Sequence, residues 1–285
     1  MTIVSASTTK KADGEIRLLA LDLDGTLLND SKKVSPQTID GLACLAERDV
    51  RIVIASARPP RSVRHIYADL KLDTLQINYN GALIWDEPGG RAVFHRPLAG
   101  KLVRAIIEMS RDLFEEVLVS CEVMDRWYTD RVEEKHTTET GRLFRPDVVA
   151  PLEEFFEIDT TKLLLSADPN IISRLEAELL ENFGDRVTIL QTDEHLLQIA
   201  HPNVGKAQAL QRVAGHYGVP MNQVMAIGDA LNDVGMLQLA GIGVAMDNAH
   251  SAVKAVADWV APSNNDHGVH AALVRFGLCG GSENS

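Results

Sequence analysis

The chain lacks the long apolar stretches that membrane proteins carry. No uninterrupted apolar run in its 285 residues approaches the roughly 18 that a membrane-spanning helix needs. Residues 1–16 are polar and contain no apolar segment of the kind found in secretory signals, so we interpret them as a loose tail. The sequence therefore predicts a cytoplasmic protein without a membrane partner.

Basic residues are also in short supply. The 28 Lys and Arg against 40 Asp and Glu give a net charge of −12. This balance disfavours nucleic acid or an anionic membrane surface as a partner. A small anionic ligand is still compatible with it, because a few local donors or a bound cation can hold one.

Cysteine is scarce as well. Cys44, Cys121 and Cys279 are far apart and odd in number, which fits neither a metal site nor a disulfide framework. We expect three unpaired thiols without chemistry, in a reducing compartment.

The 45% of hydrophobic residues suffices for a sizeable core and is arranged in alternating short segments. Strands are predicted at 17–21, 51–55, 75–78, 223–227, 242–246 and 258–261. Helices are predicted from Ser35 and Pro36 onward and over 62–70, 206–217, 231–239, 249–256 and 269–276. This alternation predicts an α/β fold, a Rossmann-like parallel sheet with helices on both faces.

The middle of the chain has a different pattern, and a turn signal at residues 86–90 precedes it. Helices are expected over 98–114 and 170–183, and strands over 116–120, 162–166, 187–190 and 196–199. We interpret residues 85–199 as an α+β domain inserted into a catalytic core made of 1–84 and 200–285.

Several acidic side chains follow strands of the predicted sheet. Asp22, Ser56 and Asp229 each come at the carboxyl end of a strand, where ligands bind in such sheets. Asp24 and Asp233 bring more negative charge to this edge. Neighbouring carboxylates repel, so a cation or a shared proton is needed, and Mg²⁺ prefers oxygen ligands. Taken alone, however, the Asp-Gly pair at 24–25 would more often be a simple turn.

Two further residues are informative only together with these acidic side chains. The Ser56 hydroxyl could bond a phosphate oxygen or cap the next helix. Lys206 opens a predicted helix, where it could neutralise a phosphoryl group or simply be solvated.

The motifs resemble those of the haloacid dehalogenase (HAD) superfamily. Residues 22–26 read D-x-D-G-T, the family's first motif, and residues 228–233 read G-D-x-x-N-D, its fourth. Ser56 and Lys206 fit the second and third motifs, and all four occur in order. The D-x-D-G-T and G-D-x-x-N-D pair is the specific part of the resemblance.

Finer details resemble the Cof-type subfamily, which has a C2B cap. These are Asn-Gly-Ala at 80–82, the large insertion between the second and third motifs, and the segment 264–269. Two positions depart from the pattern. Ala57 replaces the usual glycine, so we expect an altered loop, because alanine takes a positive φ only at a cost. His267 replaces the usual aspartate, and we expect a surface residue without a catalytic role.

The resemblance implies a mechanism. Asp22 would be the nucleophile that forms an aspartyl-phosphate, and Asp24 the general acid and base. Mg²⁺ would be held by the Asp22 carboxylate, the backbone carbonyl of Asp24 and the Asp229 carboxylate. The cap would close over the site and exclude water.

The same resemblance gives supporting roles to the remaining polar residues. Ser56 and Lys206 would hold phosphoryl oxygens. Asn232 and Asp233 would orient Lys206, the metal shell or its waters. Arg58 would face the substrate entrance or form a surface salt bridge.

The sequence therefore favours a magnesium-dependent phosphomonoester hydrolase for small metabolites such as sugar phosphates or nucleotide-like cofactors, as a monomer or homodimer. One alternative is a phosphosugar mutase similar to the phosphomannomutases; another is a non-catalytic metabolite-binding relative. Residues 125–128 could touch a sugar or a ring, or be ordinary strand and turn residues.

Overall fold

The computed structural model describes residues 15–133 and 139–280. Most of the predicted tail, residues 1–14, lies outside these ranges. Ile16, which the sequence assigned to that tail, is instead buried in the core at 5% exposure. No helix among the described residues is long and apolar enough to cross a membrane. Cys44, Cys121 and Cys279 are all free thiols, as expected.

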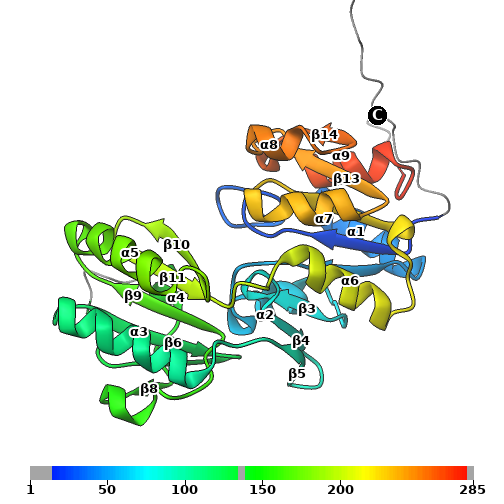
Figure 1. The fold of residues 1–285 in the computed structure, drawn as a ribbon. Coiled ribbons are helices and arrows are strands. Elements are labelled where there is room, and N and C mark those ends of the chain that lie inside the picture. The colour runs from blue at the N-terminus through cyan, green and yellow to red at the C-terminus, as the bar shows by residue number, and fades with distance from the viewer. Residues whose placement is uncertain (1–14, 134–138, 281–285) are drawn as a thin grey trace, which may run out of the picture.

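The core is built on one parallel sheet of five strands (Figure 1). Their spatial order is β14 (Trp259–Ala261), β13 (Ile242–Met246), β12 (Val224–Gly228), β1 (Leu18–Leu21) and β2 (Arg51–Ile54). The strands are nearly continuous runs of buried apolar residues, as in sheets covered on both faces. This confirms the predicted α/β class.

Helices cover both faces of this sheet. They are α1 (Pro36–Glu47), α2 (Pro60–Asp69), α6 (Lys206–His216), α7 (Val234–Leu239), α8 (Ser251–Lys254) and α9 (Gly268–Arg275). Helix α1 packs against α9, and α6 packs against α7 on the other face (Figure 1). The start of α1 is as predicted: the Ser35 hydroxyl accepts a hydrogen bond from the Thr38 backbone N–H at 3.3 Å.

A small antiparallel sheet lies beside the core. It contains β3 (Gln76–Asn78), β4 (Leu83–Asp86) and β5 (Arg91–His95), and a bridge between Ala55 and Ile77 joins it to the end of β2. The turn signal at 86–90 therefore joins two strands of this sheet. The strands β4 and β5 were not predicted.

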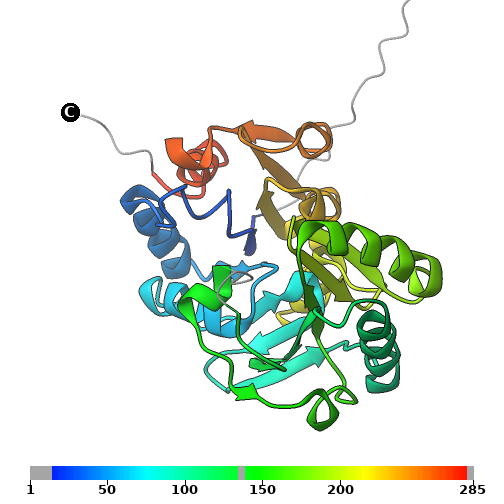
Figure 2. The same cartoon turned by 90° about the vertical axis from the view of Figure 1, so that its left-hand side faces the viewer.

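The inserted cap has a mixed sheet of six strands. Their order is β10 (Thr188–Asp193), β11 (Leu196–Ala200), β9 (Lys162–Ser166), β6 (Leu118–Val123), β7 (Arg126–Thr129) and β8 (Val148–Val149). The long helices α3 (Gly100–Leu113) and α5 (Pro169–Phe183) lie on one face, with the short α4 (Glu139–Leu143) elsewhere, and Figure 2 turns the cap toward the viewer. The predicted boundaries at 84/85 and 199/200 fall inside β4 and β11 and stay a prediction.

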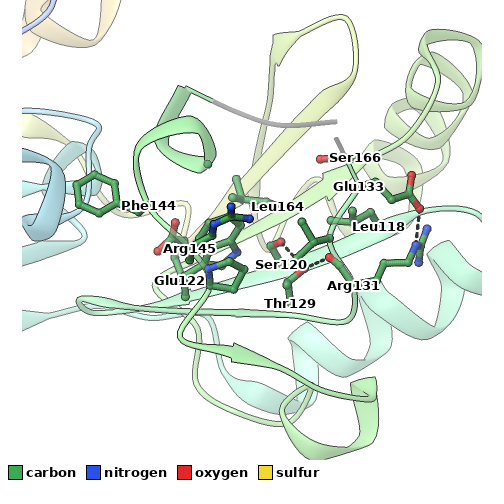
Figure 3. A pocket seen from close by; sticks show the side chains of 14 residues that line it. Leu118, Ser120, Glu122, Thr129, Arg131, Glu133, Phe144, Arg145, Leu164 and Ser166 are labelled. Carbon is green, nitrogen blue, oxygen red and sulfur yellow. Dashed lines mark hydrogen bonds and ion pairs between the residues drawn. The ribbon is translucent and has the colours of Figure 1, made fainter. Parts of the chain in front are cut away.

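The two faces of the cap sheet differ in character. Val119 and Cys121 of β6 pack with the helices in a hydrophobic cluster of the cap's own. Ser120 and Glu122 alternate with them and point to the other face, where the residues labelled in Figure 3 line a pocket of about 50 Å³. The face opposite α3 and α5, which the short α4 partly covers through Gly141, is thus partly polar.

Candidate active site

Three predicted residues meet at the carboxyl edge of the core sheet. Asp22 directly follows β1, Asp229 directly follows β12, and Ser56 follows β2 by two residues. Because these strands are parallel and adjacent, their ends lie side by side. The strands therefore deliver the side chains to one place, as the sequence predicted.

Lys206 lies at the centre of this edge. It is the first residue of α6, it is 1% exposed, and its ammonium donates to Asp22 Oδ1 and to Asp233 Oδ1, the latter at 2.7 Å. Burial alone would lower the pKa of Lys206, but the charges of Asp22 and Asp233 outweigh it and raise that pKa. A buried cation fixed between two carboxylates results.

Asp233 is fully engaged within the protein. Its Oδ1 takes Lys206, and its Oδ2 accepts the backbone N–H groups of Asp229 at 3.0 Å and Ala230 at 2.9 Å. The side chain is completely buried. Asp233 thus ties the loop after β12 to Lys206.

Asp229 is positioned by the D-x-D-G-T loop. The Thr26 hydroxyl donates to Asp229 Oδ1 at 2.7 Å. Gly25 has φ +81°, and a Cβ at this position would lie 2.4 Å from Asp229 Oδ2. Glycine is therefore required here both by the left-handed backbone and by the close approach of the acid.

Asp22, Asp229 and Asp233 form an acidic cluster that could hold a metal ion, with carboxylate oxygens within 4.8 Å of one another. Burial raises the pKa of Asp22 to about 8 against the opposing charge of Lys206, and burial also raises the pKa of Asp229. A divalent cation would offset this crowding and favour both ionised forms. Lys206 donates to one oxygen of Asp22, and Thr26 donates to one oxygen of Asp229. The second oxygen of each carboxylate is left for a cation.

Asp24 faces different cations from those of Asp22. Arg58 holds it through two bonds, Nε to Oδ2 at 2.7 Å and Nη2 to Oδ1 at 2.5 Å, and Lys32 adds a bond of 2.8 Å. Burial alone would raise the pKa of Asp24, but the hydrogen bonds from Arg58 and Lys32 hold it below its usual value. Of the two expectations for Arg58, the structure shows a salt bridge, and its side chain is 17% exposed.

Ser56 is buried, and its Oγ accepts the backbone N–H of Arg58 at 3.1 Å, so its own proton can be donated elsewhere. Ala57 does not take a positive φ, so it avoids the costly conformation, and the altered loop stays a prediction. Asn232 bonds Asn80 Oδ1 at 2.9 Å rather than Lys206.

The late segment 264–269 supports the first loop from the side. Asn264 donates to the Leu28 carbonyl at 3.1 Å, and Asn248 donates to the Gly25 carbonyl at 2.7 Å. His267 is exposed and has φ 59°, just before α9 begins. Histidine is among the residues enriched in this left-handed region, so the departure from the family pattern is tolerated there.

The region between core and cap contains a cleft of about 210 Å³. Lys206 and Asn232 line it from the core, and Lys162, Thr188, Leu190 and Gln198 line it from the cap. Residues 125–128 do not line this cleft. Asp125 accepts from the Arg61 backbone and from Arg64, both at 2.6 Å, β7 begins at the next residue, and Trp127 lines the smaller pocket of the cap. Both interpretations of this segment stay predictions.

Sequence reasoning missed three contacts of this site: Thr26 to Asp229, Lys32 to Asp24, and Asn248 to the Gly25 carbonyl. The motif position of Thr26 was a usable signal. The other two residues carry no local signal, because only the fold brings them to the loop.

The fold and the clustered acids define a HAD-type hydrolase, and the comparisons agree. Residues 19–273 match the haloacid dehalogenase-like hydrolase family, so the chain belongs to it; it is a phosphatase of the Cof-type, subclass IIB branch with a cap. It is similar to the 5-amino-6-(5-phospho-D-ribitylamino)uracil phosphatase YitU of Bacillus subtilis, at 31% identity over 91% of this chain and 97% of that protein.

Solved structures show the same architecture. A Thermotoga maritima protein superposes with a TM-score of 0.84 at 30% identity, covering 91% of this chain and 97% of that one. A HAD subclass IIB sugar phosphatase gives a TM-score of 0.75 at 21% identity, covering 92% and 100%. Because its identity is only 21%, the second similarity supports the fold alone.

Proposed function

We propose that the protein is a magnesium-dependent phosphomonoester hydrolase that works through an aspartyl-phosphate on small phosphorylated metabolites. The observation that carries this is the meeting of Asp22, Lys206 and Asp229 at one buried edge of the core sheet. A carboxylate, a fixed cation and a metal-competent acid pair are the groups that phosphoryl transfer requires.

In the first step, an oxygen of Asp22 attacks phosphorus in line while the ester P–O bond breaks. The leaving alkoxide takes its proton from Asp24. In the second step, Asp24 accepts a proton from water, which attacks the aspartyl-phosphate and releases inorganic phosphate. The ion pairs of Asp24 with Arg58 and Lys32 favour the ionised form that this second step uses, so Asp24 must take up a proton against them before the first step. We assign Arg58 to the substrate entrance because its partner Asp24 is the group that meets the leaving oxygen.

The other polar groups hold the phosphoryl oxygens. Lys206 is fixed by two carboxylates, so it meets the developing charge without reorganising. Ser56 has a proton to donate, and Asn232 lines the cleft. Asp233 acts through Lys206 and the loop, not on the substrate.

A magnesium ion fits the donor set. Carboxylate oxygens of Asp22 and Asp229 and the backbone carbonyl of Asp24 would hold it, and hard oxygen ligands suit this ion. When bound, the ion would offset negative charge between the nucleophile and the phosphoryl group. We assign Asp233 no direct bond to it, because both its oxygens are already engaged.

The test is release of phosphate from p-nitrophenyl phosphate with and without Mg²⁺. We expect turnover that depends on the ion and is lost in Asp22→Asn, while Asp40→Asn, an exposed change on α1, keeps it. Undiminished turnover by Asp22→Asn would refute the nucleophile. A panel of phosphorylated metabolites, with 5-amino-6-(5-phospho-D-ribitylamino)uracil among them because YitU is named for it, then ranks substrates by kcat/KM.

The mutase alternative is tested with mannose 1-phosphate. Conversion to the 6-phosphate, without equal release of inorganic phosphate, would replace hydrolysis by internal transfer. Measured absence of Mg²⁺ binding by calorimetry would instead support a non-catalytic relative.

A further inference from the structure

One cation of the cleft has no part in the chemistry described so far. Lys162 is the first residue of β9 in the cap and lines the cleft that also contains Lys206. Leu163 and Leu165 of the same strand pack into the cap's hydrophobic cluster. Strand alternation therefore places Lys162 on the face of the cap sheet opposite α3 and α5, toward the core.

The Lys162 ammonium reaches the core side of the cleft. It lies 5.1 Å from the centroid of the Tyr79 ring, and Tyr79 belongs to the short helical turn that follows β3. A cation over an aromatic face is held in place electrostatically. Lys162 is thus fixed across the gap between cap and core.

The nearest candidate counter-ion is already taken. Glu122 lies opposite Lys162 where β6 pairs with β9. Its two carboxylate oxygens accept hydrogen bonds from Arg61, at 2.7 and 2.6 Å, and one of them also accepts a hydrogen bond from the Tyr79 hydroxyl at 3.1 Å. Within the described residues, Lys162 has no carboxylate at ion-pair distance, and the residues that line the cleft include no Asp or Glu. An uncompensated positive charge therefore faces the cleft.

Burial lowers the pKa of Lys162, against the opposing charge of Glu122. A partly desolvated cation gains most from an anion that enters the same space. The volume of about 210 Å³ lies below the usual range of drug-sized ligand sites, so the entering group is small.

We infer that Lys162 is a specificity-determining residue that favours substrates whose leaving group carries a second anionic group, a carboxylate or a second phosphate. The inference rests on the proposed phosphatase function, because it assigns the transferred phosphoryl group to Lys206 and the second anion to Lys162. One end of the substrate would meet the core cation and the other end the cap cation.

The experiment uses two matched pairs of phosphoesters. Glycerol 3-phosphate and 3-phosphoglycerate differ by a carboxylate; fructose 6-phosphate and fructose 1,6-bisphosphate differ by a second phosphate. Each compound is measured as a competitor of p-nitrophenyl phosphate hydrolysis, so binding is scored even where turnover is slow. We expect the anionic member of at least one pair to bind roughly 10- to 100-fold more tightly, the range for a hydrogen bond to a charged group.

Variants then assign the preference to the residue. Lys162→Met should remove most of the difference within the pair, and Lys162→Arg should keep part of it because the charge remains. Lys101→Met, an exposed lysine on α3 of the same cap, serves as the matched control and should keep the full difference. Thermal unfolding of each variant shows whether the fold is intact, and Lys162→Gln replaces Lys162→Met if that variant does not fold.

Equal competition within both pairs, or no competition by either anionic member, overturns the inference. So does a preference that survives in Lys162→Met. These outcomes are distinct from failure of the proposed function, which is read from magnesium-dependent hydrolysis of p-nitrophenyl phosphate by the unmodified protein.

Discussion

The ion pair between core and cap gives a quantitative prediction. Arg61 of α2 and Glu122 of β6 are 8% and 4% exposed in their side chains, and their bonds span the two parts of the molecule. Among the described residues, the Nε and Nη1 atoms of Arg61 have no hydrogen-bond partner, and Glu122 is the acid that neutralises this guanidinium. The pKa of Arg61 reflects the balance: burial would lower it, but the Glu122 charge raises it overall.

Removing Glu122 should leave an uncompensated buried charge. We expect Glu122→Met to lower the free energy of unfolding by about 3 to 5 kcal/mol, and Arg61→Met to lower it by less, because the Lys162 charge still acts on Glu122. The double variant should lose much less, because an apolar pair of similar volume replaces both charges. Tyr79 keeps a partner in every variant, since its hydroxyl also donates to the Met124 carbonyl at 2.7 Å.

Denaturant unfolding followed by circular dichroism and tryptophan fluorescence measures the four proteins of this cycle. Glu108→Gln on the exposed face of α3, where the side chain is 52% exposed, is the control and should leave the midpoint unchanged. If Glu122→Met costs under about 1 kcal/mol, as an exposed pair would, the buried-charge reasoning is refuted.

Three further predictions concern the candidate site. Burial raises the pKa of Asp22 to about 8 in the metal-free fold, whereas the unfolded chain releases this proton near pH 4. The stability of the metal-free protein should therefore fall as the pH rises from about 4 to 8. Thermal scans should show that Mg²⁺ stabilises the protein more at pH 8 than at pH 5, and an equal effect at both pH values would contradict this. Gly25→Ala should weaken Mg²⁺ binding measured by calorimetry, because its Cβ would lie 2.4 Å from Asp229 Oδ2, and unchanged affinity would count against that contact. Asp233→Asn should lower kcat by about 100-fold or more with a smaller change in KM, because it releases Lys206; a change confined to KM would argue against this positioning role.

The sequence predicted the core well because its signals are local. The strand Ile242–Met246 was predicted with its observed bounds, and the helix after Ser35 begins where serine and proline place it. Strands β4, β5 and β7 were not predicted. The residues of β5 and β7 are mostly not fully buried, so these two strands lack the continuous apolar run that marks the core strands β1 and β13. The acids of the site could also be predicted, because they belong to short sequence motifs that are recognisable without knowledge of the fold.

Contacts between distant segments could not be read in this way. Arg61 is the second residue of α2, a helix with a low mean hydropathy, where an arginine is ordinarily solvated, yet it is buried against Glu122 from the cap. Lys32 reaches Asp24 across a loop. Lys162 reads as a strand residue, and its place over Tyr79 depends on how cap and core are docked.

Tyr79 contacts both the ion pair that joins cap and core and the cap lysine that faces the cleft. Its hydroxyl bonds Glu122 and the Met124 carbonyl, so it helps to dock the cap, while its ring carries the Lys162 ammonium that faces the cleft. The bonds of the acid cluster, by contrast, join core residues throughout the part of the chain that the structure describes, as between Asp22 and Asp233 through Lys206. Changes in the cap face can therefore alter which leaving group is accepted without moving the groups at the core edge, whereas a change that undocks the cap alters the Lys162 position at the same time.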